Sequence, residues 1–179
     1  LEIEVGDWVI REALRQMDEW NAQGVDLPIS INISGKHLLH EGFTQRLADL
    51  LAAHPNIPPG RIELEVLETA ALEDMAKVAA LFADCRRMGV SFALDDFGTG
   101  YSSLAYFRPL PADGLKIDQS FIRNMLDDAD DLAIVEGVIG LTQAFRRQVI
   151  AEGVETVEHG LVLLLLGCDL AQGFGIARP

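Results

Sequence analysis

Two adjacent aspartates, Asp95 and Asp96, stand in the segment LDDFGTG and offer oxygen ligands for a divalent cation. Carboxylate oxygens are hard ligands that suit Mg²⁺ or Mn²⁺. Zinc or copper would call for His or Cys, and the four histidines and two cysteines form no metal-binding cluster in the sequence. A bridging carboxylate flanked by further acids holds two cations roughly 3.5 to 4 Å apart for in-line phosphoryl chemistry. The paired acids therefore predict a metal centre that acts on a phosphate ester.

The two aspartates need a turn in the chain if they are to share one site. Neighbouring residues on a strand point to opposite faces, so Asp95 and Asp96 can meet one ligand only where the strand ends. The segment 97–100, FGTG, predicts that turn, because its two glycines permit positive φ and a close approach to a ligand. Ser102 and Ser103 are then expected to cap a short helix.

A polar residue that could bind a metal or activate water lies at the C-terminal end of each strand-like run. In chain order these residues are Asn32, Glu65, Asp95 with Asp96, Lys116, Glu152 and Gln172. Any one of them alone is better explained as a helix cap or a solvated loop residue, but the whole set favours a site. Lys116 could orient the attacking water or neutralise charge on the phosphorane, and Glu152 could ligate a metal or accept the proton. The alternative for Lys116 is a plain surface lysine.

Helical and strand-like segments alternate along the chain and must position these residues. Apolar residues at helical spacing predict helices over 7–22, 43–53, 72–88, 131–146 and 156–166. Strand-like runs cover 28–33, 62–66, 91–95, 114–117, 148–151 and 170–173. Because strand alternates with helix, we expect an α/β domain over residues 1–179, with right-handed βαβ units and a parallel sheet.

Two architectures are compatible with this alternation. A doubly wound open sheet would collect its ligands at one switch point, whereas a TIM-type (β/α)₈ barrel recruits site residues from the ends of many strands. The polar strand ends favour the barrel. Six strands cannot close it, so two strands are expected upstream of Leu1. The absence of an initial Met is in keeping with a fragment.

Composition excludes several classes of protein. The formal net charge of −14 opposes sequence-independent binding to DNA or RNA. A phosphate-bearing ligand would need metal ions to offset the negative electrostatic potential of the protein. The apolar run 161–166 is far shorter than the roughly 20 residues of a membrane span, so we expect a buried helix and no membrane contact from this segment. Cys85 and Cys168 fit reduced thiols of a cytoplasmic protein, whose other domains could anchor it to a membrane.

These residues together resemble the EAL family of cyclic-di-GMP phosphodiesterases over essentially the whole chain. The segment 95–104 is similar to the family's D-D-F-G-T-G-Y-S-S-L loop at all ten positions. The segment 31–34 is similar to the family's N-x-S strand end, and the segment 65–69 is similar to its E-x-T-E-S motif. The segments that resemble the remaining family signatures are 116–118, 151–155, 167–169 and 172–174. The resemblance implies hydrolysis of cyclic-di-GMP to linear pGpG with two Mg²⁺ or Mn²⁺ ions, on a TIM-type barrel of EAL type with one antiparallel strand.

The resemblance also implies roles for single residues. Asn32, Glu65 and Asp95 would bind one metal ion, while Asp95, Asp96 and Glu152 would surround the other. Lys116 would hold the water. Glu68 would tether the loop 96–104, which in this family also communicates with a dimer interface, and Gln172 would support the substrate pocket.

The chain departs from the family pattern in ways that affect the expected activity. The triplet Glu12-Ala13-Leu14 lies in the amphipathic first helix and has Gln16 where the E-x-L-x-R signature needs Arg. The true signature, with a further metal-binding Glu, is therefore expected upstream of Leu1, and this chain alone should be weak or inactive. Leu67, Thr69 and His37 replace the usual Thr, Ser and Gln without removing a ligand.

Two other functions remain open at this point. A degenerate EAL domain could bind cyclic-di-GMP as a receptor without turnover, and the upstream Glu would decide this. Some other metal-dependent barrel enzyme would require the ten-residue loop match to be accidental. Expected partners are cyclic-di-GMP, a second copy in a homodimer, and a sensory or GGDEF-type domain in the parent chain.

Overall fold

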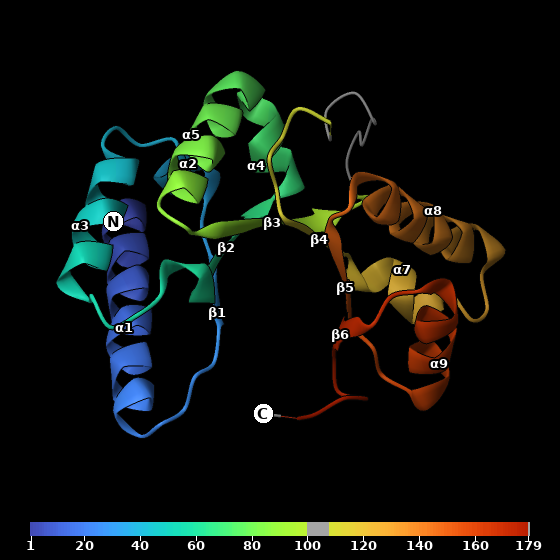
Figure 1. Ribbon diagram of the computed structural model, residues 1–179. Coiled ribbons are helices and arrows are strands. Elements are labelled where there is room, and N and C mark those ends of the chain that lie inside the picture. Colours follow the sequence, from blue (N-terminus) through green and yellow to red (C-terminus); the bar gives the residue numbers. More distant parts are fainter. Residues whose placement is uncertain (100–107, 179) are drawn as a thin grey trace. The chain divides into compact units, whose positions relative to one another are not determined.

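The computed structural model describes residues 1–99 and 108–178 (Figure 1). The chain divides into two compact units, one formed by Leu1–Ala93 with Pro109–Pro111 and the other by Leu94–Arg108 with Ala112–Pro179. Most of the loop 96–104, including the expected helix cap at Ser102 and Ser103, lies outside the described residues. Among the described helices, none is long and apolar enough to cross a membrane.

The first unit holds the N-terminal helices and two complete strands. Its elements are α1 (Glu2–Ala22), β1 (Ile29–Asn32), α2 (Gly35–Leu38), α3 (Phe43–Ala53), the 3₁₀ turn η1 (Pro59–Arg61), β2 (Ile62–Leu67), α4 (Glu68–Glu73) and α5 (Met75–Arg87). The strand β3 (Ser91–Phe97) begins in this unit and ends in the second. Strands β1 and β2 pair in parallel, with Asn32 opposite Glu65, as the alternation of elements predicts.

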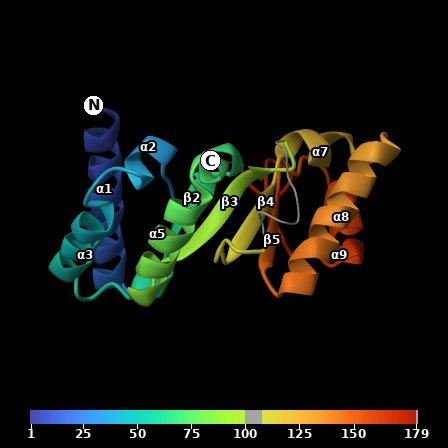
Figure 2. The same ribbon diagram turned by 90° about the horizontal axis from the view of Figure 1, so that it is seen from above.

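Local sequence explains why α1 is longer than predicted. Its buried residues Ile10, Leu14 and Met17 recur at helical spacing and form one face. The helix begins at Glu2 rather than at residue 7, because the acidic Glu2 and Glu4 in its first turn interact favourably with the helix dipole. Figures 1 and 2 both show α1 beside α3.

The helix predicted over 72–88 is confirmed as α5, but it begins at Met75, and the short helix α4 before it was not predicted. The chain breaks at Asp74 (φ −147°, ψ 77°), and the Asp74 carboxylate accepts a hydrogen bond from the Lys77 backbone N–H at 3.2 Å. An aspartate that caps the following turn ends one helix and starts the next. The short helices α2 and α7 (Gln119–Asn124) were not predicted either, and side-chain oxygens of Ser34 and Asp118 cap them.

The second unit contains the end of β3 and three further parallel strands. These are β4 (Gly114–Ile117), β5 (Gln148–Glu152) and β6 (Leu170–Gln172), with β5 between the other two. Helix α8 (Ala129–Phe145) joins β4 to β5 and α9 (Val157–Leu166) joins β5 to β6. At their C-terminal ends, α8 and α9 are joined by a hydrogen bond of 3.4 Å that Gln143 Nε2 donates to the Leu166 carbonyl. Strand, helix and strand therefore repeat as the sequence predicts.

Helix α9 confirms the helix predicted over 156–166 but not its burial. Only Leu163 of its leucines is fully buried, whereas Leu161 and Leu164 are exposed and Leu165 is 86% exposed. The predicted buried helix is thus wrong for most of the run 161–166. The helix has apolar residues on every side, and a single neighbouring layer can cover only one face.

The core of the first unit contains a stacked aromatic pair that provides a test of its packing. The rings of Phe82 on α5 and Phe92 on β3 lie 3.8 Å apart between centroids, with an angle of 12° between their planes, and both side chains are fully buried. We expect Phe82→Ala to lower the free energy of unfolding by about 3–5 kcal/mol, because it removes buried area and leaves a cavity. Urea unfolding followed by circular dichroism measures this, with the exposed Leu165→Ala as the control. A loss no larger than the control's would contradict the described packing.

The two cysteines provide a second test. Both are free and buried, and burial together with the neighbouring Asp84 charge raises the pKa of Cys85 to about 12. Burial likewise raises the pKa of Cys168. Only the thiolate reacts with thiol reagents, and a raised pKa keeps the thiol protonated until the pH passes that value. At pH 8 to 9, both thiols should resist a disulfide reagent in the native protein and react in denaturant; rapid native labelling of Cys85 would contradict its placement.

Candidate metal centre

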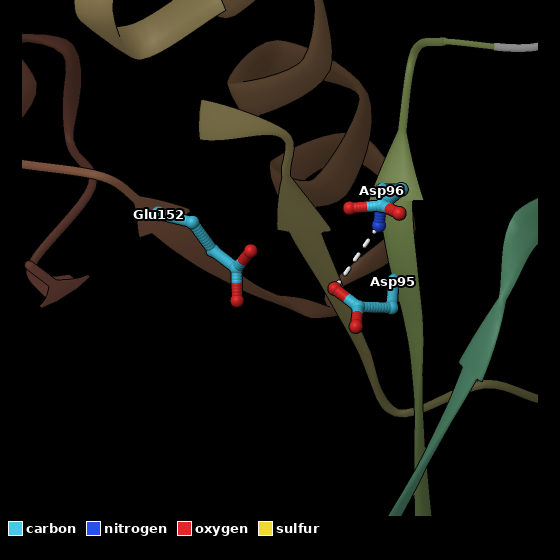
Figure 3. Close-up of side chains that lie close together, drawn as sticks. All are labelled: Asp95, Asp96 and Glu152. Atoms are coloured by element: carbon cyan, nitrogen blue, oxygen red, sulfur yellow. Dashed lines mark hydrogen bonds between the residues drawn. The ribbon is translucent and has the colours of Figure 1, made fainter. Parts of the chain in front are cut away.

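The paired aspartates are brought together by the backbone at Asp96. Strand β3 continues to Phe97, but Asp96 takes a positive φ of 54°, and Gly98 follows with φ 102°. The turn predicted in the segment 97–100 is thus present at Gly98, and the positive φ at Asp96 precedes it within the strand. The Asp96 backbone N–H donates a hydrogen bond of 3.0 Å to Asp95 Oδ1, which fixes the orientation of that carboxylate (Figure 3).

Glu152 completes a group of three carboxylates. It is the last residue of β5, and one carboxylate oxygen from each of Asp95, Asp96 and Glu152 lies within 4.8 Å of the other two. Figure 3 shows the Glu152 side chain extended toward the two aspartates. Three predicted site residues from two strands of the second unit therefore meet in one place.

Lys116 joins this group from β4. Its side chain is only 5% exposed, and its Nζ lies 2.5 Å from Glu152 Oε1 and 3.4 Å from Asp95 Oδ1. The alternative of a plain surface lysine is therefore wrong. The Lys116 ammonium thus pairs with Asp95 and Glu152 and orients both carboxylates.

Burial and the neighbouring acids shift the pKa values of two carboxyl groups in this cluster. The pKa of Asp96 rises to about 6, first because burial disfavours the charged form, then through the Asp95 charge, a hydrogen bond and charge from Asp118, and the Glu152 charge. Burial acts in the same direction on Asp118, but hydrogen bonds from the Ser120 side chain and backbone and from Asp96 hold the pKa of Asp118 below its usual value. The pKa values of these two neighbouring carboxyl groups are thus shifted in opposite directions.

The donor set fits a divalent cation. Three carboxylates with oxygens this close are hard ligands and suit Mg²⁺ or Mn²⁺. Burial and the acidic neighbours that raise the pKa of Asp96 both disfavour its charged form, and a bound cation would offset both effects. Among the described residues, this group of three is where acidic, His or Cys side chains gather closely enough to hold a metal ion.

The remaining predicted residues lie at strand ends in their own units. In the first unit, Asn32 ends β1 opposite Glu65, and Glu65 is buried. Glu68 is buried at the first turn of α4, and the loop it is predicted to tether lies mostly outside the described residues. In the second unit, Gln172 ends β6 opposite Glu152 and lines the same cavity as that residue.

Sequence reasoning missed Asp118 as part of the centre. It follows β4 by one residue, caps α7 and shares a hydrogen bond with Asp96. The signal was present, because Asp before a short polar helix predicts an N-cap, and that position also faces the end of the strand before it. No role was assigned to it, since capping alone explains an aspartate there.

Comparison with known proteins decides the family. The EAL domain family matches residues 1–179, the whole chain. The chain belongs to the EAL domain family. Its predicted fold class, a TIM-type barrel of EAL type, is confirmed by solved EAL structures. It is similar to the chain described as "PaMucR Phosphodiesterase, c-di-GMP complex", with a TM-score of 0.93 and 39% identity over 99% of this chain and 72% of that one. The EAL domain of Mycobacterium smegmatis DcpA gives a TM-score of 0.94 and 39% identity over 100% of this chain and 80% of that one.

Full-length relatives of this EAL domain are much longer than the chain. The bifunctional diguanylate cyclase/cyclic di-GMP phosphodiesterase MucR of Pseudomonas aeruginosa is 39% identical over 178 residues, which are 99% of this chain and 26% of MucR. The cyclic di-GMP phosphodiesterase PA2567 of the same organism is 35% identical over 175 residues, 98% of this chain and 30% of that protein. The chain therefore spans less than a third of the length of either relative.

The geometry of the three carboxylates predicts a measurable effect on metal binding. Asp96→Asn should weaken Mn²⁺ binding to the full-length protein by roughly 10- to 100-fold, because one anionic ligand is lost from a group of three. Isothermal titration calorimetry with Mn²⁺ measures the affinity, and the exposed Asp127→Asn is the matched control. Equal affinity in Asp96→Asn and the control would show that Asp96 is not a ligand.

Proposed function

We propose that this EAL domain hydrolyses cyclic-di-GMP to linear pGpG with the help of two Mg²⁺ or Mn²⁺ ions. The observation that carries the proposal is the group of Asp95, Asp96 and Glu152, whose carboxylate oxygens lie within 4.8 Å of one another beside the Lys116 ammonium. Acidic ligands for hard cations next to a buried lysine are what in-line attack on a phosphodiester requires.

Similar proteins support the substrate. MucR and PA2567 are both named cyclic di-GMP phosphodiesterases, and the solved MucR phosphodiesterase is described as a c-di-GMP complex. The net charge of −14 disfavours binding of a nucleic-acid polymer. It is compatible with a small phosphate ligand whose charge bound cations would neutralise.

The proposed metal ligands fall into two sets. Asp95, Asp96 and Glu152 would surround one ion, and Asp95 would reach a second one. The EAL resemblance, rather than any described contact, assigns Asn32 and Glu65 to that second ion. When bound, the ions supply positive charge that stabilises the phosphorane and favours deprotonation of the attacking water.

The chain's own groups would handle water and protons. Lys116 Nζ, which lies between Asp95 and Glu152, would donate a hydrogen bond that orients the attacking water and would offset charge on the phosphorane. Glu152 would either bind metal or accept the water's proton. Attack at phosphorus breaks the P–O3′ bond, the O3′ leaving group gains a proton, and the product is linear with a terminal 5′-phosphate. Gln172 would support the substrate pocket, and Glu68 the loop 96–104.

Longer relatives support additional domains in the parent protein. MucR combines a diguanylate cyclase with a phosphodiesterase in its name, and the chain matches 26% of it. We propose a sensory or GGDEF-type domain in the full-length protein, and a homodimer that communicates with the site through the loop 96–104.

The Asp95 carboxylate allows a direct test of hydrolysis. In the full-length protein, Asp95→Asn should lower the rate of pGpG formation at saturating Mg²⁺ by at least about 100-fold, because the variant loses a charged ligand to both ions. Chromatography of the nucleotide products measures the rate, and Asp127→Asn is the control for folding and expression.

The same assay separates an enzyme from a receptor. Wild-type protein that binds cyclic-di-GMP and Mg²⁺ but forms no pGpG would contradict the proposed hydrolysis and favour a receptor domain. Undiminished turnover by Asp95→Asn would contradict the proposed role of the metal centre.

A further inference from the structure

The short helix α2 follows the end of β1 that carries Asn32, and it contacts the N-terminal helix α1. The Ser34 hydroxyl caps α2 by accepting a hydrogen bond of 3.2 Å from the His37 backbone N–H. A helix of one turn has too few internal hydrogen bonds to be stable by itself, so its neighbours set its position. The proposed chemistry assigns no role to the side chains that do this.

On the strand side, α2 is attached to the elements that surround the proposed ligand Glu65. The Ile33 N–H donates a hydrogen bond of 2.8 Å to the Glu65 carbonyl, which joins the end of β1 to β2. A Cβ on Gly35 would lie 2.7 Å from the Ala70 Cβ, so α2 and α4 are in close contact. The position of α2 therefore affects the backbone at the ends of both strands.

On the helix side, the His37 side chain attaches α2 to α1. It is only 1% exposed, and its Nε2 lies 2.7 Å from Asp7 Oδ1. Asp7 is held in turn by Arg46 on α3, whose Nε lies 3.3 Å from Asp7 Oδ2. The His37 ring also packs at right angles against the Phe43 ring of α3, with 5.2 Å between centroids. One buried side chain thus contacts two neighbouring helices.

The other ring nitrogen of His37 faces Gly6 of α1. Nδ1 is buried and has no hydrogen-bond partner among the described residues, so we assign the ring proton to Nε2, which donates to Asp7. A Cβ on Gly6 would lie 2.1 Å from Nδ1. Glycine inside a helix is about 1 kcal/mol less favourable than alanine, so the approach of His37 explains why glycine occurs here.

Packing alone does not explain a histidine at this position. A buried polar atom without a partner costs about 1–3 kcal/mol, whereas an apolar side chain would fill the same space without this cost. The hydrogen bond from His37 to Asp7 is directional, and apolar packing is not. The polar side chain is therefore better explained by a need to hold α2 in one orientation relative to α1.

We propose that His37 is a positioning residue for the metal-binding ends of β1 and β2. Its hydrogen bond to Asp7 holds α2 in one orientation, and α2 holds the backbone that presents Asn32 and Glu65. This inference rests on the proposed function, because that function assigns Asn32 and Glu65 to a metal ion. His37 itself acts through the backbone and is not a ligand.

Mn²⁺ binding to the full-length protein tests this role. Isothermal titration calorimetry compares wild type with His37→Ala and His37→Gln. His37→Ala should weaken the binding of one of the two ions by roughly 10-fold, because the ligands remain but are less well oriented. His37→Gln should stay within about 2-fold of wild type, because the Gln amide nitrogen reaches nearly the position of Nε2 and can donate to Asp7.

Gly6→Ala tests the same contact with the histidine retained. Its Cβ would displace the His37 ring, so the Mn²⁺ affinity should fall as in His37→Ala. Gly137→Ala is the matched control, because a Cβ on this glycine of α8 meets no described heavy atom within 4 Å and should leave the affinity unchanged. In the His37→Ala background, Gly6→Ala should raise the Tm instead of lowering it, because alanine favours the helix once the ring is absent.

The outcomes separate this inference from the proposed function. Wild-type Mn²⁺ affinity in folded His37→Ala or Gly6→Ala would show that His37 only stabilises the fold and would overturn the proposal. Equal losses in His37→Gln and His37→Ala would contradict the role of the hydrogen bond to Asp7. Wild-type protein that binds two Mn²⁺ ions but forms no pGpG would contradict the proposed hydrolysis, and the calorimetry would still decide the role of His37. Wild-type protein that binds no second ion would overturn both.

Discussion

The carboxylates of Asp95, Asp96 and Glu152 are held with oxygens within 4.8 Å of one another, although like charges at that distance repel. Lys116 supplies one positive charge and is paired with two of the three acids. The pKa of Asp96 rises to about 6, first because the side chain is partly buried and then because acidic neighbours surround it. A folded protein keeps such an arrangement where a cation completes it. The proposed metal binding rests on this one constraint.

The backbone maintains this crowding at a cost. A positive φ at a residue other than glycine, as at Asp96, costs of the order of 1–3 kcal/mol and persists only where surrounding structure enforces it. Here the Asp96 N–H bonds to Asp95, while β4 and β5 bring Lys116 and Glu152 to the same end of the parallel strands. The strain turns the second aspartate out of the alternating strand pattern, so two sequence neighbours can serve one site.

Much of this organisation was readable from the sequence because strands and long helices have strong periodic signals. The predicted bounds of α3 and β4 agree with the structure, and the other strands agree to within about two residues. The short helices α2 and α7 have too few residues for a period, and their capping side chains are their main signal. The break at Asp74 and the exposed leucines of α9 depend on tertiary packing, which periodicity does not report.

The residues of the candidate site were also predictable only in part. Asp95, Asp96, Lys116 and Glu152 were predicted from their positions at strand ends, since parallel strands bring their ends together. The contact of Asp118 with Asp96 was not predictable, because it joins residues from separate turns. The EAL family adds Asn32 and Glu65 to the proposed ligands, and their opposed positions on β1 and β2 agree with a shared strand-end location in the first unit.

The central claim is that Asp95, Asp96 and Glu152 together hold a divalent cation. Anomalous diffraction at the manganese edge, from crystals of the full-length protein grown with Mn²⁺, locates bound ions directly. The account predicts a strong peak within about 2.0 to 2.3 Å of an oxygen from each of the three carboxylates, as expected for hard-cation coordination. Crystals in which manganese sites lie elsewhere, with these three side chains contacting no ion, would contradict it.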